Sequence, residues 1–314
     1  MRIVLFLLLS VVLGETTSEN ELTFTYDNSI ENELTVTVTG TGNSVWKSVT
    51  VNDGDPAFNT VKHVVIGAGI SEIDGLMFNY HDSVKTITAT EDCTLKTIAE
   101  NNILGCKSLL KIIIPTLETI GTNSIGDCSN LVDFDFTSIK SIGDKVFEKS
   151  NLKNPFFGEH LESLGNEAFS NMQMESITVH QNNKKFLNDS HGVLYEIKSD
   201  ENKKLVIYPS LIPLTEYTIM DGTNEIAMMG FNAANNLVKI NFNQVSKLHY
   251  QSFNSCKGLI TVHLGKALLY IPHGAFINCD NIQTYEVDEN NPFLEIDENG
   301  FFLTKVIKNK AIVR

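Results

Sequence analysis

Few residues in this sequence combine the types and the spacing that chemistry requires. Asp189, Ser190 and His191 are the three residue types of a hydrolase triad, but neighbours in sequence cannot easily adopt the triad geometry, and no nucleophile elbow surrounds them. The eight histidines include no His-Glu-x-x-His motif. Segments 288–290 and 297–300 faintly resemble calcium loops, but they lack EF-hand spacing and the closing glutamate, so we interpret them as turns. We therefore expect no catalytic residue, no metal site and no cofactor.

The five cysteines raise a second kind of chemistry, the disulfide bond. Cys106 and Cys128 lie 22 residues apart, and Cys256 and Cys279 lie 23 apart, so stacked coils of that length would bring each pair within bonding reach. The same offset also fits a small thiol packed beside an apolar core, and the sequence leaves both interpretations open. Cys93 has no such mate, and no spacing approaches the Cys-x-x-Cys of zinc sites.

A fixed period positions these cysteines and orders the rest of the chain. A phenylalanine or isoleucine returns about every 22 residues, with an aliphatic residue five positions before each; such a period is typical of a leucine-rich-repeat solenoid. The repeated positions are Ile103, Ile125, Phe147, Phe169, Phe231, Phe253 and Phe276. We predict a mostly β solenoid in which short parallel strands alternate with helical or 3₁₀ turns, such as residues 166–169. Gly121, Gly143 and Gly165 are expected at sharp bends that need positive φ.

Each rung opens with the pattern apolar-x-x-apolar-x-apolar, which predicts a strand whose alternate residues face inward. The residues between them then share one outward face, the kind of surface that solenoid proteins use for binding. The candidate ligand-binding residues are Lys111, Ile113, Asp133, Asp135, Asn154, Phe156, Thr178, Lys239, Asn241 and His263. Ile113 and Phe156 are large and apolar where solvent is expected. Either they are ordinary isolated exposed residues or they anchor a partner.

Segments outside the repeat predict the domain organisation. Residues 1–14 have the basic start, apolar run and small final residues of a secretory signal peptide. Residues 15–60 hold two alternating segments that predict a β-hairpin capping the first rung. The rungs follow over 61–288, with a second hairpin inserted at 182–210, and 289–314 begins the same motif again as a terminal hairpin or cap.

Composition and targeting narrow the class of partner. The net charge of −14 argues against nucleic acid and anionic membrane, since both need a basic face. The apolar run of the leader is shorter than the roughly 20 residues that span a bilayer, and no later segment is longer. We expect an exported protein, secreted or peripherally attached to a cell surface, without a membrane span. Asn188, in an Asn-Asp-Ser sequon, is a candidate glycosylation site.

The repeat and its insertion resemble the BspA-like leucine-rich-repeat family of bacterial and protozoan surface proteins. The family core Ile-x-x-x-Ala-Phe-x-x-Cys is matched from Ile271 through Phe276 to Cys279. Residues 191–195 match the family's Asp-Gly-Val-Leu-Tyr with His in place of Asp, and residues 34–42 are similar to the segment that precedes such repeats. The resemblance implies a surface antigen with a role in cell adhesion or binding, whose partners include host cell surfaces and matrix.

Two hypotheses follow for function. In the first, the chain is a non-enzymatic protein that binds an extracellular protein or glycan through the outward face of its sheet. In the second, it is a structural surface-coat component that self-associates end to end through its hairpin caps. A hydrolase is disfavoured because no catalytic constellation accompanies the repeat.

Overall fold

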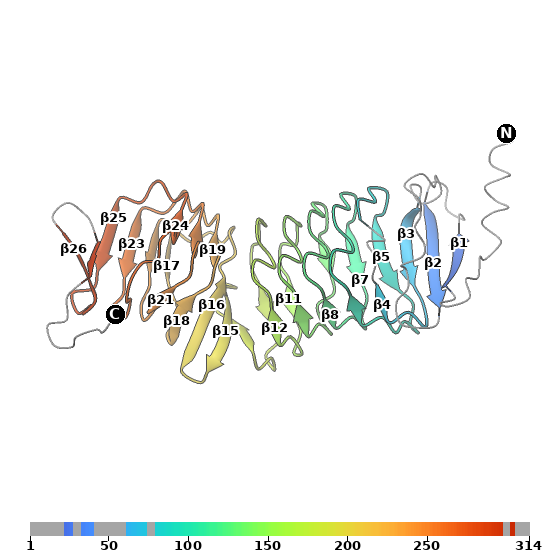
Figure 1. The fold of residues 1–314 in the computed structure, drawn as a ribbon, viewed down its shortest axis with the longest axis horizontal. Coiled ribbons are helices and arrows are strands. Elements are labelled where there is room, and N and C mark those ends of the chain that lie inside the picture. The colour runs from blue at the N-terminus through green and yellow to red at the C-terminus, as the bar shows by residue number, and fades with distance from the viewer. Residues whose placement is uncertain (1–21, 28–32, 41–60, 74–78, 298–301, 305–314) are drawn as a thin grey trace, which may run out of the picture. The chain divides into compact units, whose positions relative to one another are not determined.

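The protein is built from short strands that stack rung upon rung. The computed structural model describes residues 22–27, 33–40, 61–73, 79–297 and 302–304. These divide into two compact units, unit 1 (Met1–Met172) and unit 2 (Gln173–Arg314), and the described residues of both contain strands and turns but no helix (Figure 1). The predicted signal peptide lies outside the described residues, as does segment 41–60 of the predicted N-terminal cap.

Unit 1 carries two sheets among its described strands. The first has the order β1-β2-β3-β5-β7-β9, and the second has the order β12-β10-β8-β6-β4. Every pair from β2 onward is parallel, which confirms the predicted solenoid. The strands are β1 (Leu22–Asp27), β2 (Leu34–Gly40), β3 (Val61–Ile66), β4 (Glu72–Ile73), β5 (Thr86–Ala89), β6 (Thr97–Ile98), β7 (Lys111–Ile113), β8 (Thr119–Ile120), β9 (Asp133–Phe134), β10 (Ser141–Ile142), β11 (Phe156–Phe157) and β12 (Ser163–Leu164).

Unit 2 repeats this plan around a hairpin. Its described strands form sheets of order β14-β15-β16-β18-β21, β17-β20-β23-β25, β19-β22-β24 and β26-β27. The strands are β13 (Thr178–Val179), β14 (Phe186–Asn188), β15 (Leu194–Ser199), β16 (Asn202–Ile207), β17 (Glu216–Thr218), β18 (Thr223–Ile226), β19 (Phe231–Asn232), β20 (Lys239–Asn241), β21 (Lys247–Leu248), β22 (Phe253–Asn254), β23 (Thr261–Leu264), β24 (Phe276–Ile277), β25 (Thr284–Val287), β26 (Leu294–Ile296) and β27 (Phe302–Thr304).

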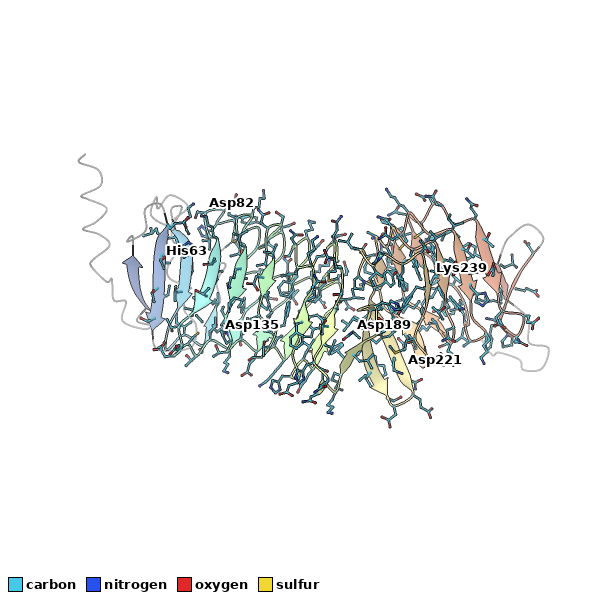
Figure 2. All side chains as sticks on the ribbon, turned by 180° about the vertical axis from the view of Figure 1, so that it is seen from behind. His63, Asp82, Asp135, Asp189, Asp221 and Lys239 are labelled. Carbon is cyan, nitrogen blue, oxygen red and sulfur yellow. The ribbon has the colours of Figure 1, made fainter. Side chains whose placement is uncertain are left out.

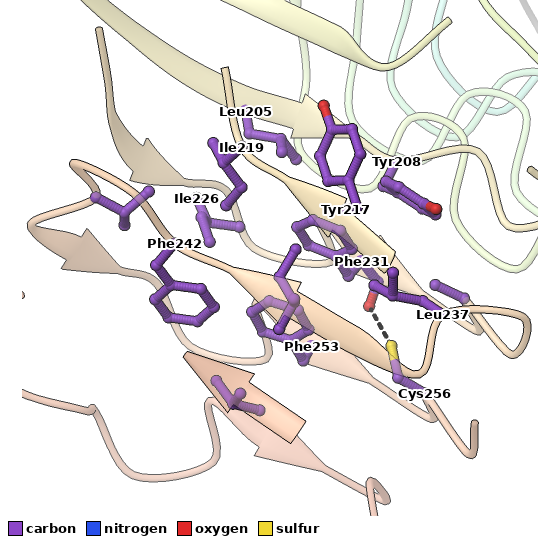
Figure 3. Packing of buried hydrophobic residues seen from close by; sticks show 14 of the residues in the cluster. Leu205, Tyr208, Tyr217, Ile219, Ile226, Phe231, Leu237, Phe242, Phe253 and Cys256 are labelled. Carbon is purple, nitrogen blue, oxygen red and sulfur yellow. Dashed lines mark hydrogen bonds between the residues drawn. The ribbon is translucent and has the colours of Figure 1, made fainter. Parts of the chain in front are cut away.

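The repeated residues form the core of each unit. The period-marking side chains from Ile103 to Phe253 are buried, and Phe276 on the last rung is partly buried. In unit 2, Phe231 stacks on Phe253 with ring centroids 4.5 Å apart (both are labelled in Figure 3). Phe253 in turn stacks on Phe276 at 4.8 Å. Burying such a side chain stabilises the fold by about 1.5–3 kcal/mol. The 22-residue period therefore exists because each rung adds one plug to a shared interior.

The expected helical turns are absent from the described residues, so that prediction was wrong. At residues 166–169 the chain forms a turn in which Glu167 has a φ of 56°, a left-handed conformation that ends any right-handed helix. In the equivalent turns of the preceding rungs, backbone N–H groups bond to the next rung instead, as in Ile125 N–H to Val146 O (3.0 Å) and Phe147 N–H to Ala168 O (2.8 Å). Rung-to-rung bonding has taken the donors that a helix would use.

Gly121, Gly143 and Gly165 occupy the bends, but not for the reason the sequence suggested. None has positive φ; the left-handed positions of the neighbouring rungs are filled by residues such as Asn123 and Asp127. A Cβ on Gly121 would instead lie 2.5 Å from Glu100 N, and one on Gly165 would lie 2.3 Å from Gly143 C. The glycines are required because adjacent rungs approach too closely for any side chain.

Two antiparallel hairpin pairings in unit 2 share one register. Phe186 pairs with Glu196 in β14 and β15, and Leu294 pairs with Thr304 in β26 and β27. Each residue of the second pair therefore follows the corresponding residue of the first pair by 108 positions in the sequence. In both, one asparagine (Asn183 or Asn291) accepts two backbone N–H groups at 2.8 Å. The pairing of β1 with β2 is likewise antiparallel; that any of these hairpins serves as a cap stays a prediction.

Candidate binding surface

In unit 1, parallel pairing carries each outward position from one rung to the next. One column of paired residues runs His63, Thr86, Lys111 and Asp133, and a second runs Val65, Thr88 and Ile113. The alternate residues Val64, Ile87 and Ile112 are buried, so the two columns share the outward face. The structure thus places the candidates Lys111, Ile113 and Asp133 side by side.

The N-terminal end of this face holds a tightly bonded charged group that the sequence did not suggest. His63 Nδ1 lies 2.8 Å from Thr86 Oγ1, and its Nε2 lies 2.7 Å from Glu33 Oε2 (His63 is labelled in Figure 2). Lys85 Nζ donates to the other Glu33 oxygen at 2.6 Å. Hydrogen bonds from Lys85 and then His63 lower the pKa of Glu33. The order of hydroxyl, imidazole and carboxylate resembles that of a hydrolase triad, but here it joins Glu33, the residue just before β2, to β3 and β5.

Charged candidates in the middle of the face are paired but remain accessible. Lys111 Nζ lies 3.2 Å from Asp133 Oδ2, and both side chains are about half exposed. Asp135, just beyond β9, accepts the Thr137 N–H at 2.9 Å through Oδ1, which fixes a local turn. Exposed ion pairs contribute only about 0.2–1 kcal/mol to stability. These charged side chains therefore contribute little to the stability of the fold, and they remain accessible to solvent and to a ligand.

Two exposed apolar side chains, Leu110 and Val132, form a short column beside Lys111 and Asp133, and the sequence did not lead us to expect it. Leu110 and Val132 are 43% and 53% exposed, and Val132 N–H bonds to Leu110 O, which stacks them on consecutive rungs. Unit 2 has the same arrangement, where Val238 is 36% exposed and Ile260 N–H bonds to Val238 O. The available signal was a doubled apolar pair just before four of the strands (β7, β9, β20 and β23): Leu109-Leu110, Leu131-Val132, Leu237-Val238 and Leu259-Ile260.

The corresponding sheet of unit 2 presents a second mixed face. The outward positions of β17, β20, β23 and β25 pair in the order Glu216, Lys239, Thr261 and Thr284, beside Thr218, Asn241, His263 and Glu286. Glu286 lies 3.5 Å from His263 Nδ1 and 3.8 Å from Lys239 Nζ, so one carboxylate joins two candidates (Lys239 is labelled in Figure 2). Asn241 Oδ1 accepts the Asn243 N–H at 2.8 Å.

The remaining candidates are solvent-facing within their own units. Phe156 in β11 is 44% exposed, and Asn154 just before it is also exposed. Thr178 in β13 of unit 2 is exposed. None of the ten candidates is buried, in contrast to the inward residues that alternate with them. A ligand-binding role for them stays a prediction.

The repeat and its geometry match one family. The sequence profile described as the BspA type leucine rich repeat region matches residues 71–192 and 208–312, in six copies. The chain belongs to the BspA-type leucine-rich-repeat family. The resemblance found in the sequence is thereby confirmed, and the gap between the matched segments coincides with β15 and β16, which lie beside the BspA-type rungs.

Solved structures show the same fold at low sequence identity. A leucine-rich repeat protein from Eubacterium ventriosum is similar over 86% of this chain and 73% of its own, with a TM-score of 0.60 and 20% identity. The pneumococcal vaccine antigen PcpA is similar over 88% and 89%, with a TM-score of 0.54 and 17% identity. A leucine rich cell surface protein from Faecalibacterium prausnitzii covers 86% and 94%, at 0.51 and 17%. Comparison with curated proteins found no match.

The sequon of this BspA-type chain begins at Asn188, the last residue of β14, and the triad-like residues 189–191 lie in the turn between β14 and β15. Asn188 Oδ1 accepts the Val179 N–H at 2.8 Å, and its amide donates to Asp189 O at 2.9 Å. Asp189 accepts N–H bonds from His191 and Val193 at 2.9 Å, and the Tyr217 hydroxyl donates to it at 2.6 Å (Asp189 is labelled in Figure 2). This carboxylate therefore fixes the turn of the hairpin, and glycosylation of Asn188 stays a prediction.

Buried tyrosines complete the base of the hairpin. The Tyr195 hydroxyl is hydrogen bonded to the Tyr217 hydroxyl and accepts the Met220 N–H at 3.3 Å. Burial raises the pKa of Tyr195 to about 12 and also raises that of Tyr217. Both phenols stay neutral at physiological pH, so the network acts as a structural tie and not as a proton donor at neutral pH.

All five cysteines are buried free thiols. Cys128 Sγ donates to Ile103 O at 3.1 Å, and Cys256 Sγ donates to Phe231 O at 3.4 Å (Figure 3). Each of these two thiols thus bonds to the carbonyl of the period-marking residue one rung earlier. The structure shows the packed-thiol arrangement, one of the two that the sequence left open.

Two further surveys cover the part of the chain that the structure describes. Within it, no three His, Cys, Asp or Glu side chains are grouped so that they could hold a metal ion. Asp288 Oδ1 accepts the Asn290 N–H at 2.8 Å, the hydrogen bond of an ordinary turn. No helix there is long and apolar enough to cross a membrane.

Proposed function

We propose that this BspA-type chain is a non-enzymatic protein, secreted or peripherally attached to a cell surface, that mediates adhesion by binding an extracellular protein or glycan. The binding surface is the outward face of its parallel sheets. Export rests on the sequence of residues 1–14, and the similar protein of F. prausnitzii is described as a cell surface protein. Repeat scaffolds of this kind are generally used for recognition.

The observation that carries the proposal is the apolar column beside the charged one. Leu110 and Val132 stand exposed on consecutive rungs, next to Lys111 and Asp133, in an arrangement that unit 2 repeats with Val238 and Lys239. Interfaces combine an apolar centre with a polar rim, and covering exposed apolar area yields about 25 cal/mol per Å². Aliphatic columns gain most against apolar surface, which favours a protein partner over a glycan.

The test compares two surfaces of the same protein. The double variant Ile113→Ser with Val132→Ser removes apolar side chains from the sheet face of unit 1. Its control, Leu269→Ser with Tyr270→Ser, removes similarly exposed apolar side chains (45% and 52%) that lie outside the described strands of unit 2. Binding of the labelled full chain to intact cells and to immobilised extracellular matrix would be measured by fluorescence.

We expect the sheet-face variant to bind at least about tenfold more weakly than wild type, since central anchors cost about 1–4 kcal/mol when truncated. The control variant should bind like wild type, and both should keep the wild-type circular dichroism spectrum. Equal binding by the two variants would contradict the proposal that the outward sheet face is the binding surface.

A further inference from the structure

The second sheet of unit 1 presents a face that the proposed function does not use. At four of its five rungs, the outward strand positions are small hydroxyl residues and the position just before each strand is charged; at the fifth, β4, the outward position is Glu72, which pairs with Thr97. The hydroxyl column is Thr97, Thr119, Ser141 and Ser163, and the charged column is Lys96, Glu118, Lys140 and Glu162. Parallel pairing in register keeps each column straight, with neighbours about 4.8 Å apart.

The signs of the charged column alternate strictly from rung to rung. Lys96 Nζ lies 2.7 Å from Glu118 Oε1, and Lys140 Nζ lies 2.6 Å from Glu118 Oε2. All four side chains reach solvent. Hydrogen bonds from Lys140 and then Lys96 lower the pKa of Glu118 to about 2, so this pattern of charges is present throughout the physiological range.

On the bend side of these charges, the neighbouring columns are made of small residues. Ser163 Oγ donates to Ser141 Oγ at 2.8 Å, which joins two neighbouring members of the hydroxyl column. The next column at the bend consists of Ala99, Gly121, Gly143 and Gly165. Small residues permit close approach of a second flat surface, as they do between closely packed helices.

An alternating column of four charges is complementary to itself in one orientation. When a second copy faces it with the solenoid axis reversed, Lys96 meets Glu162 and Glu118 meets Lys140. With the axes in the same direction, every charge would meet its own kind. We propose that this face is an isologous contact between two copies of the chain, with the two-fold axis parallel to the strands and passing between the rungs of Glu118 and Lys140.

Unit 2 lacks this pattern, so the contact belongs to unit 1. The equivalent positions are Asn224, Ser246 and Leu269, which carry no charge. The alternating charges of unit 2 (Lys204, Glu225 and Lys247) lie one position later, where unit 1 has its hydroxyl column. The contact is small: four rungs at about 4.8 Å and about five residues at 3.3 Å give roughly 300 Å² per copy. Stable interfaces bury about 800 Å² per partner, so the dimer is weak and forms when copies are concentrated, as on a surface.

The test rearranges the four charges without changing their sum. Lys96→Glu with Glu162→Lys gives the order Glu-Glu-Lys-Lys, which is still self-complementary when reversed. Lys96→Glu with Glu118→Lys gives Glu-Lys-Lys-Glu, which opposes like charges throughout. Sedimentation velocity from about 1 μM to about 1 mM would measure the dimer dissociation constant of each, and thermal unfolding would verify that each folds.

We expect wild type and the first variant to dimerise, and the second to dimerise roughly tenfold more weakly or worse, because juxtaposed like charges repel. Adding Lys140→Glu with Glu162→Lys, whose order is Lys-Glu-Glu-Lys, should restore association in an equimolar mixture with the second variant. Dimers should dissociate near 1 M salt, where the Debye length is about 3 Å. A monomeric wild type, or equal dimerisation of the first two variants, would overturn the proposal; neither result bears on binding by the sheet face.

Discussion

Unit 1 and unit 2 are built from the same rung but fill its bend differently. At the bend, unit 1 has Gly121, Gly143 and Gly165 on consecutive rungs, whereas unit 2 has Ala227, His249 and Pro272 at the equivalent positions. A Cβ on any of the three glycines would lie within 2.6 Å of backbone in the neighbouring rung. His249 not only fits but places its Nε2 2.9 Å from Glu225 Oε2 on the previous rung. The glycine column is thus a requirement of tight bends in unit 1 and not of the repeat itself.

The aromatic cores of the two units also differ, in the angle at which their rings meet. The phenylalanines of unit 1 meet mostly edge to face or tilted, as Phe134 meets Phe147 at an interplanar angle of 77°. Those of unit 2 are stacked and nearly parallel, with interplanar angles of 9° between Phe231 and Phe253 and 20° between Phe253 and Phe276. One hydrophobic period therefore accommodates two packings, since burial fixes the position of a side chain more strongly than the orientation of its ring.

The largest predicted effect on the free energy of unfolding comes from removing one buried phenylalanine ring from the core of either unit. Phe147→Ala in unit 1 and Phe253→Ala in unit 2 each remove a fully buried ring, and each should lower the free energy of unfolding by about 3–5 kcal/mol. Because the units are separately compact, hydrogen exchange followed by mass spectrometry should show faster exchange mainly in the mutated unit. Uniform acceleration across both units by either substitution would contradict their separate packing.

A smaller effect should distinguish the two bends. Gly143→Ala places a Cβ 2.6 Å from Thr122 N and should lower the free energy of unfolding by about 1–3 kcal/mol. His249→Ala, at the equivalent position of unit 2, removes only a partly exposed side-chain contact with Glu225 and should lower the free energy of unfolding by less than about 1 kcal/mol. Chemical denaturation of both variants measures the difference. If Gly143→Ala were neutral, close rung approach would not be the reason for glycine.

How much of this could be predicted follows from the physics of each feature. The period of Ile103, Ile125 and Phe147 gave the solenoid and the direction of the strand side chains, because burial repeats with the rung. The reason for Gly143 could not be predicted, since it depends on the distance between rungs. The left-handed conformations at Lys145 and Glu167 were equally hidden, because neither residue type favours them.

The candidate surface was predictable in part for similar reasons. Alternation along a strand placed Lys111 and Ile113 on the outward face from sequence alone. The Glu33–His63–Thr86 group joins three segments distant in sequence, so only the folded register brings it together. Leu110 was missed because the pattern assigned apolar residues to the interior, and the second residue of a doubled pair has no room there.

The smallest effect concerns the pH dependence of Glu118, in the column of unit 1 formed by Lys96, Glu118, Lys140 and Glu162. The pKa of Glu118 is lowered from 4.5 to about 2 by hydrogen bonds from Lys140 and Lys96. Its contribution to stability is therefore full above about pH 4.5 and is lost as pH falls toward 2. Carboxyl chemical shifts in an NMR titration should show this midpoint, and Lys140→Met with Lys96→Met should return it toward 4.5. An unchanged midpoint in that variant would show that the two lysines are not the cause of the lowered pKa of Glu118.

The central claim, that the outward sheet face is where a partner binds, is tested most directly by site-specific photocrosslinking. A photoreactive side chain would replace Ile113 on that face, or Tyr270 outside it, in the otherwise intact protein, which would then be irradiated on intact cells. The account predicts a discrete crosslinked adduct from position 113 that excess unlabelled protein abolishes, and none from position 270. An adduct from position 270 alone would contradict it.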